Sequence, residues 1–159
     1  MRQVNITINI DFCSMEELTR DERELVQMAI DATKNSYAKY SKFYVGAAVR
    51  LEDGQVFIGA NQENAAFPSG LCAERTAIFS AQANSPGQAI TTLAVAARNN
   101  FGPLDNPVTP CGGCRQVMLE MEDRYQRDVK VLLYGKKGIY RVKSVKDLLP
   151  LSFVDANMK

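Results

Sequence analysis

The chain contains neither histidine nor tryptophan among its 159 residues. Without an imidazole, metal binding and proton transfer must rely on cysteine, carboxylate and other side chains. Long apolar runs are missing too, since nothing approaches the roughly 20 residues that cross a bilayer. The opening segment, MRQVNITINI, alternates polar and apolar side chains and so lacks the basic and apolar regions of a signal peptide. We therefore expect no membrane partner.

An excess of charge of one sign is also absent, because 19 lysines and arginines balance 18 aspartates and glutamates. Both signs are scattered along the chain, so the sequence offers no basic groove for a nucleic-acid backbone. A small-molecule substrate is therefore favoured, with no nucleic-acid partner. The four cysteines, in a chain without a signal peptide, favour a cytoplasmic location, where thiols and metal ligands are more common than disulfides.

A single domain is expected over residues 1–159, because a chain of this length can bury one sizeable core. Only the segment 99–110, NNFGPLDNPVTP, is rich in proline and glycine. No change in composition divides the chain, so we expect this segment to be a long loop within one domain.

The pattern of apolar residues predicts strands that alternate with helices. Two β-rich runs in 43–61 are joined at Asp53-Gly54, a dipeptide suited to a tight hairpin turn. Similar criteria predict a strand over 3–10, followed by a helix over much of 15–36 that begins with Ser14 and Glu17 as a capping box. Further helices are expected over 73–84, 114–125 and 144–150. Further strands are expected over 90–98, 129–135 and 138–142. This order predicts an α/β fold, a three-layer α-β-α sandwich around a central mixed sheet of about five strands.

Three of the four cysteines fall at the starts of predicted helices. Cys72 precedes the helix over 73–84, while Cys111 and Cys114 stand in the sequence TPCGGCRQVM. A helix N-terminus lowers the pKa of a thiol, because unpaired backbone N–H groups and the helix dipole stabilise the thiolate. Three thiolates on one Zn²⁺ leave a fourth tetrahedral position open, as in catalytic zinc sites. The pattern therefore predicts one catalytic zinc ion per chain.

A glutamate completes the pattern that zinc-dependent nucleobase deaminases use. In these enzymes a metal ligand is followed two residues later by a glutamate that moves protons, and a Pro-Cys-x-x-Cys motif supplies the other ligands. Here these positions are Cys72, Glu74 and the segment 110–114. Together with YSKFYVGAAV, NQENAAFPSGLCAERTA and LLPLSF, they give the chain a resemblance to the small homotetrameric, three-cysteine cytidine deaminases. The resemblance covers 36–153 and leaves 1–20 as an N-terminal extension.

This resemblance implies an activity and a set of residue roles. The implied reaction is the zinc-dependent hydrolytic deamination of cytidine and 2′-deoxycytidine to uridine and 2′-deoxyuridine, with release of ammonia, in pyrimidine salvage. Cys72, Cys111 and Cys114 would bind zinc, Glu74 would be the catalytic proton carrier, and Arg75 would compensate the charge of the thiolates. In the substrate site, Asn61 and Glu63 would hold the ribose. Phe43 would pack on the base, and the backbone of Ala73 would orient the amide edge of the base. The resemblance also implies a homotetramer with shared active sites, in which Phe153 would reach the site of a neighbouring subunit.

Other interpretations of the cysteines stay open. If Cys13 were a fourth ligand, the zinc site would be closed and the chain would be a non-catalytic structural module. A lone buried cysteine, however, is usually a small hydrophobic residue. Cys111 and Cys114 could form a redox pair, although that function needs neither Cys72 nor Glu74.

Two other deaminase activities would share the zinc motif. A nucleic-acid cytosine deaminase needs a basic, aromatic-lined groove, which this near-neutral chain does not indicate. A deaminase of a related cytosine nucleoside, including nucleoside antibiotics, would carry the same ligands. Tyr44 stands where many relatives have proline, so the sequence leaves the preference between cytidine, deoxycytidine and modified bases open.

Overall fold

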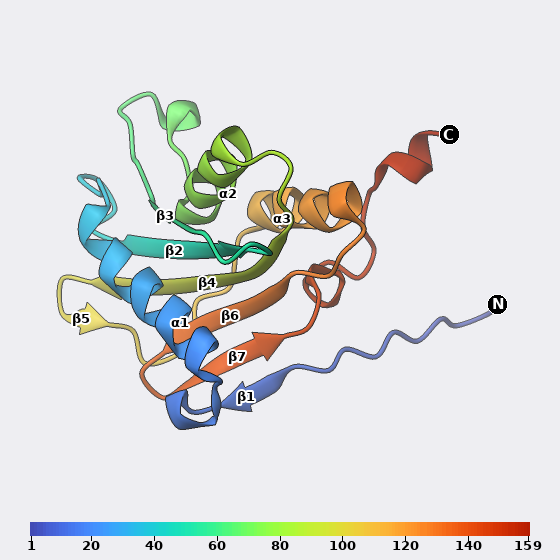
Figure 1. Cartoon of the computed structure of the whole chain (residues 1–159), viewed down its shortest axis with the longest axis horizontal. Coiled ribbons are helices and arrows are strands. Elements are labelled where there is room, and N and C mark those ends of the chain that lie inside the picture. The colour runs from blue at the N-terminus through green and yellow to red at the C-terminus, as the bar shows by residue number, and fades with distance from the viewer.

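A mixed β-sheet forms the middle layer of the molecule and carries helices on both faces (Figure 1). The computed structural model describes residues 1–159. The strands are β1 (Asp11–Cys13), β2 (Tyr44–Leu51), β3 (Val56–Ala60), β4 (Ile90–Asn99), β5 (Gly102–Pro103), β6 (Lys130–Gly135) and β7 (Gly138–Val142). The α-helices are α1 (Arg20–Ala32), α2 (Ala73–Asn84) and α3 (Gly112–Tyr125), and short 3₁₀ helices span Met15–Glu17, Thr33–Asn35, Phe67–Ser69, Val145–Leu148 and Asp155–Met158.

The strands follow the order β1-β7-β6-β4-β2-β3, and β5 pairs with the end of β4. β4 and β6 run parallel, whereas every other neighbouring pair is antiparallel. The predicted α/β class and three-layer architecture with a mixed sheet are confirmed. The sheet has seven strands instead of about five, because β1 and β5, of three and two residues, are too short to leave a recognisable pattern.

The strand predicted over 3–10 is wrong. Residues 1–10 are extended but belong to no strand, and pairing begins only in β1, where Asp11 lies opposite Arg141 of β7. Because β7 ends at Val142, which this register places opposite Ile10, residues 1–9 have no neighbouring strand within the chain. Alternation predicts an extended backbone, but a strand also needs a hydrogen-bonding partner, and a local pattern cannot supply that information.

The first helix is shorter than predicted because two capping sequences follow each other. α1 is capped by Thr19, whose Oγ1 accepts a hydrogen bond from the amide of Glu22 (3.2 Å), while the Glu22 carboxylate accepts one from the amide of Thr19 (3.0 Å). The predicted box caps a separate 3₁₀ turn instead, in which the Glu17 carboxylate accepts a hydrogen bond from the amide of Ser14 (2.8 Å). Each cap starts its own element, so the segment divides into a turn and a helix.

Two hydrophobic cores lie on opposite faces of the sheet. The core under α1 includes Leu25, Val26 and Ala29 of that helix with Ala48, Ala94, Leu132 and Ile139 of the strands. The core under α2 and α3 includes Ala77, Ile78, Met118 and Leu119 of those helices with Val49, Leu93, Val95, Val131 and Leu133 of the strands. Both helices that follow the cysteine motifs therefore lie on the same face of the sheet.

The contact between α2 and β3 requires a glycine. A Cβ added at Gly59 would lie 2.4 Å from the backbone nitrogen of Ala77, so a larger residue would push α2 away from the sheet. This close packing fixes the N-terminus of α2, where Cys72 is the N-cap residue.

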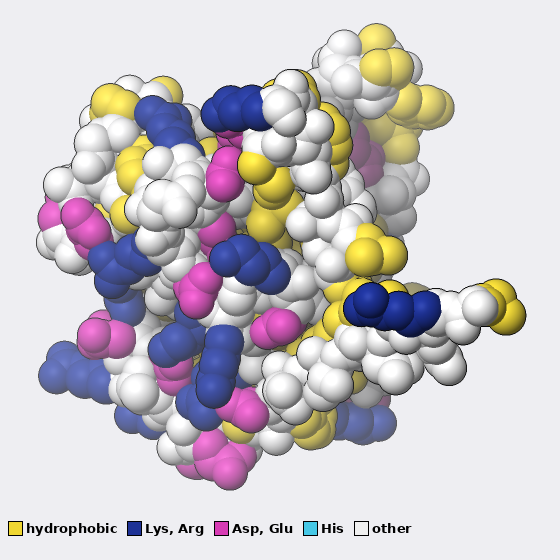
Figure 2. Space-filling view, turned by 90° about the vertical axis from the view of Figure 1, so that its right-hand side faces the viewer, with side chains coloured by type: hydrophobic (Ala, Val, Ile, Leu, Met, Phe, Trp, Pro, Cys, Tyr) yellow, Lys and Arg dark blue, Asp and Glu magenta, His cyan; other side chains and the backbone are white.

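Charged side chains of both signs are intermixed on the surface. On the face that Figure 2 shows, Lys and Arg alternate with Asp and Glu, and no continuous basic stripe runs across it. None of the helices combines the length and the apolar character that a membrane crossing requires.

Candidate metal centre

The structure brings three cysteines from two helix N-termini together. Cys72 is the N-cap of α2, Cys111 is the N-cap of α3, and Cys114 lies in the first turn of α3. Their three Sγ atoms lie within 4.8 Å of one another. Neither Cys72 nor Cys111 makes a side-chain capping hydrogen bond, so both sulfurs are available to a ligand. Both also lie at a helix N-terminus, where the unpaired backbone N–H groups favour negative charge.

This donor set fits a zinc ion. Sulfurs bound to one tetrahedral zinc at about 2.3 Å lie about 3.8 Å apart. The observed separations, all within 4.8 Å, are compatible with such a site. Cysteine is the preferred soft ligand of zinc, and Gly112 and Gly113, between two of the ligands, have no neighbouring atoms that would hinder such a movement. Three sulfurs from one chain also match a site that keeps a fourth position open.

Arg75 supplies a positive charge next to the sulfurs. Its Nη2 donates a hydrogen bond to Sγ of Cys72 at 3.3 Å, while its Nε is buried without a hydrogen-bond partner. Hydrogen bonds from Cys114 and Arg75 lower the pKa of Cys72 to about 5, although burial acts in the opposite direction. The hydrogen bond to Cys72, and then burial, raise the pKa of Cys114. A metal ion that binds these sulfurs takes the place of their protons.

A buried carboxylate lies beside the sulfur cluster. Glu74 is only 6% exposed, and its Oε2 accepts a hydrogen bond from Sγ of Cys114 at 3.7 Å. Burial raises the pKa of Glu74, and the negative charge on Cys72 adds to this effect, while its own backbone amide opposes it. A carboxyl group with a raised pKa is better suited to general acid–base catalysis than an ordinary, exposed glutamate.

An open cavity of about 410 Å³ adjoins the sulfur cluster. Cys72 and Arg75 form one end of its lining, and Asn61 and Glu63 form another part. The volume suits a small polar molecule of nucleoside size. A second, smaller cavity of about 150 Å³ lies at the far end of α3 and contains none of the cysteines.

Asn61 and Glu63 both hold the loop that precedes β2. The amide of Asn61 accepts a hydrogen bond from the backbone of Val45 (2.8 Å) and donates one to the carbonyl of Phe43 (2.9 Å). The carboxylate of Glu63 accepts hydrogen bonds from the amide of Tyr40 (2.8 Å) and from the amide and hydroxyl of Ser41. The hydrogen bond from the Ser41 hydroxyl, more than any other contact, holds the pKa of Glu63 below its ordinary value.

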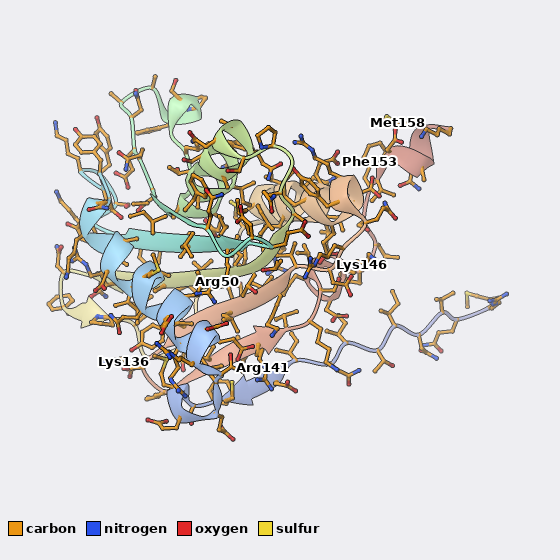
Figure 3. The ribbon with its side chains drawn as sticks, viewed as in Figure 1. Arg50, Lys136, Arg141, Lys146, Phe153 and Met158 are labelled. Atoms are coloured by element: carbon orange, nitrogen blue, oxygen red, sulfur yellow. The ribbon has the colours of Figure 1, made fainter.

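The other expected substrate residues lie in different surroundings. Ala73, the first residue of α2, is fully buried directly after Cys72. Phe43 is half-buried and does not line the cavity, although its backbone is fixed by Asn61. Phe153 is 57% exposed on the C-terminal segment beyond α3 (Figure 3) and also lies outside the cavity of its own chain.

Sequence reasoning missed Tyr40, Phe67 and Ser41. The rings of Tyr40 and Phe67 both line the cavity and meet edge to face, with centroids 5.8 Å apart. Ser41 fixes Glu63, as described above. Tyr40 begins the motif segment that supplies Phe43, and Phe67 lies in the segment that supplies Asn61 and Glu63, so their place within these segments was the available signal.

Cys13 is remote from the metal centre. It belongs to β1, is buried in the core under α1, and donates a weak hydrogen bond to the carbonyl of Ile139 at 3.7 Å. Cys72 and Cys114 contact the core on the opposite face of the sheet. A closed site with Cys13 as a fourth ligand is therefore incompatible with this fold.

A family model and curated relatives match the chain. The model of the cytidine and deoxycytidylate deaminase zinc-binding region matches residues 19–127. A cytidine deaminase of Halalkalibacterium halodurans is 39% identical over 138 residues, which cover 87% of this chain and 98% of that protein. A cytidine deaminase of Sporosarcina psychrophila is 38% identical over 133 residues, which cover 84% and 91% of the two chains.

Solved structures agree with these sequence matches. The crystal structure of a cytidine deaminase from Burkholderia pseudomallei superposes with a TM-score of 0.71 at 41% identity and covers 86% of this chain and 100% of the other. A cytidine deaminase from Mycobacterium tuberculosis superposes with a TM-score of 0.67 at 29% identity and covers 86% of this chain and 99% of the other.

Proposed function

The chain belongs to the cytidine and deoxycytidylate deaminase family, and from this premise we propose that it hydrolyses cytidine and 2′-deoxycytidine to uridine and 2′-deoxyuridine. Water is consumed, and ammonia leaves from C4 of the base. The observation that carries this proposal is the cluster of three sulfurs with the buried carboxylate of Glu74 at its side, next to a cavity of nucleoside size.

Cys72, Cys111 and Cys114 would hold one zinc ion per chain. When bound, this ion supplies a Lewis acid that lowers the pKa of a water molecule from 15.7 to about 7 and so provides a nucleophile at neutral pH. Three thiolates and one Zn²⁺ carry a net charge of about −1, which works against the loss of a proton. The two helix N-termini, at about +0.5 each, and the guanidinium of Arg75 offset this negative charge.

Glu74 is the proposed proton carrier. Its carboxylate takes one proton from the attacking water and passes it to N3 of the pyrimidine. It then takes the second proton of that water, from the hydroxyl group formed at C4, and passes it to the amino group, which leaves as ammonia. Burial beside the cluster raises the pKa of Glu74, so the carboxylate takes up a proton from water more readily than an exposed glutamate would. Because its Oε2 lies 3.7 Å from Sγ of Cys114, the carboxylate already stands next to the place where the nucleophile is held.

The remaining site residues are assigned to substrate binding. Asn61 and Glu63 would hold the ribose hydroxyl groups, because both side chains line the cavity and keep hydrogen-bonding capacity beyond their contacts to the loop. Phe43 would pack on the base. The backbone at Ala73, at the N-terminus of α2, would orient the amide edge of the base.

Assembly into a homotetramer with shared sites is part of the same proposal. Phe153 lies outside the cavity of its own chain and is exposed, which supports a role in the site of a neighbouring subunit. We further propose that residues 1–159 act as one domain, that the chain has no nucleic-acid or membrane partner, and that it serves pyrimidine salvage in the cytoplasm. The intermixed surface charges support the absence of a nucleic-acid partner.

A related cytosine nucleoside is the second candidate substrate class. Tyr44, the unusual residue in the base-packing segment, has its ring under the guanidinium of Arg98 (4.3 Å) and its hydroxyl 3.2 Å from Oδ1 of Asn100. It does not line the cavity. The departure from proline at this position therefore gives no reason to favour a modified base over cytidine and deoxycytidine.

Absorbance assays on the zinc-loaded protein test the proposal. Cytidine and deoxycytidine should be turned over with release of ammonia, and metal analysis should give one zinc per chain. Free cytosine should be a much poorer substrate, because it cannot use the ribose contacts. Turnover of cytosine with neither nucleoside accepted would overturn the assigned ribose site, and zinc without any turnover would favour a structural module.

A further inference from the structure

Residues 1–10, which we call the N-terminal arm, make no hydrogen bond to the rest of the chain. Figure 1 shows the arm leaving the end of β1 and running away from the sheet, and Figure 2 shows it standing out from the body. The family match begins only at residue 19, so the arm is an addition to the deaminase region. An extended segment with free N–H and C=O groups is a template for another strand.

The side chains of the arm form one apolar and one polar face. Val4, Ile6, Ile8 and Ile10 are 73%, 51%, 42% and 41% exposed, although β-branched aliphatic residues favour half-buried sheet positions. Asn5, Thr7 and Asn9 point to the other face, because successive side chains of an extended backbone alternate. The arm thus has the pattern of a strand in a sheet with one covered face.

The apolar face continues a face of the sheet. Phe12 of β1 is on the same side as the even-numbered arm residues, and its ring lies 5.4 Å from that of Tyr140 in β7. Cys13 points to the opposite side, into the core under α1. The arm therefore continues the edge strand β1 outward, and its side chains alternate between the two faces in step with those of β1.

The chain itself offers no partner for the arm. Continuation of the β1–β7 register would place Ile10 opposite Val142, the last residue of β7, and every earlier residue of the arm opposite residues after Val142. Those residues leave the sheet, because Ser144 and Val145 donate hydrogen bonds to the buried carboxylate of Glu122 at 2.7 to 3.1 Å. A partner strand must come from another molecule.

We propose that the arm pairs with the same arm of a second copy, antiparallel and centred on Thr7. Directly opposite residues of an antiparallel pair share one face of the ribbon. A centre at Thr7 puts Val4 opposite Ile10 and Ile6 opposite Ile8, so all four aliphatic side chains of each arm meet aliphatic side chains of the other. Thr7 then faces its own counterpart, and Asn5 faces Asn9, on the polar side.

Neighbouring registers are poorer. A shift by one position places every aliphatic residue opposite a polar one. A centre at Ile8 would place Val4 opposite Phe12, which lies outside the arm and whose ring already packs against Tyr140. A centre at Ile6 would place Ile10 opposite the charged Arg2. Thr7 is therefore the centre at which all four aliphatic residues of the arm pair with one another, and this self-complementarity supports a second copy of the chain as the partner.

Disulfide trapping in the zinc-loaded, full-length protein tests the register. Opposite Cβ atoms are about 5 Å apart, so Thr7→Cys should form a disulfide-linked dimer under mild oxidation. Asn5→Cys is the matched control, because the two substituted residues would be about 13 Å apart along the ribbon. Thr7→Cys should cross-link at least about tenfold faster than Asn5→Cys, and the unsubstituted chain gives the background of the native cysteines.

Substitutions on the two faces give a second test. Ile6→Asp with Ile8→Asp should abolish the Thr7→Cys dimer, whereas Asn5→Ser with Asn9→Ser should leave it. Backbone amide exchange in the arm should slow with increasing protein concentration.

Equal cross-linking of Thr7→Cys and Asn5→Cys, or arm amides that exchange as in a free peptide at all concentrations, would overturn the proposal. In the second case the apolar face has another occupant, such as a lipid surface, and vesicle binding that depends on the arm would identify it. Glu74→Gln should cross-link normally, so these readouts are independent of the proposed deaminase activity.

Discussion

The hydroxyl of Ser41 donates a hydrogen bond to the carboxylate of Glu63, and the backbone amide of Ser41 donates to the same group at 3.2 Å. The same hydroxyl also accepts a hydrogen bond from the amide of Phe43 at 3.1 Å. One side chain therefore links the proposed ribose residue to the proposed base-packing residue. Lys42, between them, has a positive φ of 55°, so this short loop needs such fixed contacts to keep its shape.

Ser41→Ala should weaken nucleoside binding more than it slows the chemical step. Glu63 would keep its two backbone donors, but it would lose the contact that most lowers its pKa and would be less firmly oriented. We expect KM for cytidine to rise about 3- to 10-fold, with a smaller change in kcat. Ser41→Thr keeps the hydroxyl and should restore KM, whereas an equal loss in both variants would show that the role is only one of packing.

The fold was predictable where the signal is local. The Asp53-Gly54 turn joins β2 and β3 as expected, and Gly54 has the positive φ of 90° that only a few residue types adopt readily. The arm shows the limit of the same reasoning, because its alternation is real but its pairing partner is absent from the chain. The split at Thr19 shows another limit, since two capping sequences close together compete for the start of one helix.

The site was partly predictable for the same reason. Cys72 and Glu74 are two positions apart, and Cys111 and Cys114 are three apart, so short motifs at helix N-termini indicate their proximity. That the two motifs meet depends on the packing of α2 and α3 on one face of the sheet. The support of Glu63 by Ser41 is a contact between residues 22 positions apart, and no spacing rule indicates it.

Glu74→Gln should retain zinc and nearly stop turnover. The amide has the shape of the carboxyl group but cannot carry a proton, and general acid–base groups typically contribute about 10²- to 10⁴-fold. The measurement is kcat with cytidine together with zinc content by metal analysis. Glu120→Gln, at an exposed position of α3, is the matched control and should behave like the unsubstituted chain. A Glu74→Gln variant with normal kcat would contradict the assigned proton carrier.

Arg75→Ala should weaken zinc retention, turnover or both by about 10- to 100-fold, as is usual for residues that hold metal ligands in place. The guanidinium is the cation that donates to Cys72 at 3.3 Å, and without it the thiolate charge is poorly balanced. Competition with a chelator measures retention, and kcat measures turnover. Arg124→Ala, exposed on α3, controls for the loss of one positive charge. Unchanged metal content and rate in Arg75→Ala would refute the role.

Glu22 should give the protein part of its acid sensitivity. Burial alone would raise the pKa of Glu22. The hydrogen bonds from Lys130 Nζ (2.7 Å) and from the amide of Thr19, together with the nearby charge of Arg141, nevertheless hold this pKa below its ordinary value. A lowered pKa in the folded state stabilises the protein above the unfolded pKa of about 4.3. This contribution is lost as the pH falls through the folded pKa.

Glu22→Gln should therefore lower the free energy of unfolding by about 1–2 kcal/mol at pH 7 and by much less at pH 3. Urea unfolding at the two pH values measures the difference. Glu24→Gln is the control, because Glu24 forms only an exposed pair with Arg20 and such pairs contribute about 0–1 kcal/mol. A pH-independent effect of Glu22→Gln would mean that lost packing, not charge, is the cause.

Arg115 joins the metal loop to the C-terminal segment, and its removal should affect both. Its Nε donates to the carbonyl of Pro110 at 2.8 Å, directly before Cys111, and its Nη1 donates to the carbonyl of Leu148 at 2.7 Å. Arg115→Ala leaves two carbonyls without these donors, so we expect a loss of about 1–3 kcal/mol in the free energy of unfolding. Zinc should also be lost more readily to a chelator, because the backbone before Cys111 is released.

Gln116→Ala separates the two effects of Arg115. Its Nε2 donates only to the carbonyl of Phe153, at 2.8 Å, so its loss frees the C-terminal segment and leaves Pro110 held. Both variants should become more sensitive to proteolysis after residue 148, but only Arg115→Ala should lose zinc faster. If Gln116→Ala loses zinc as fast as Arg115→Ala, then the C-terminal segment, and not the contact to Pro110, stabilises the metal loop.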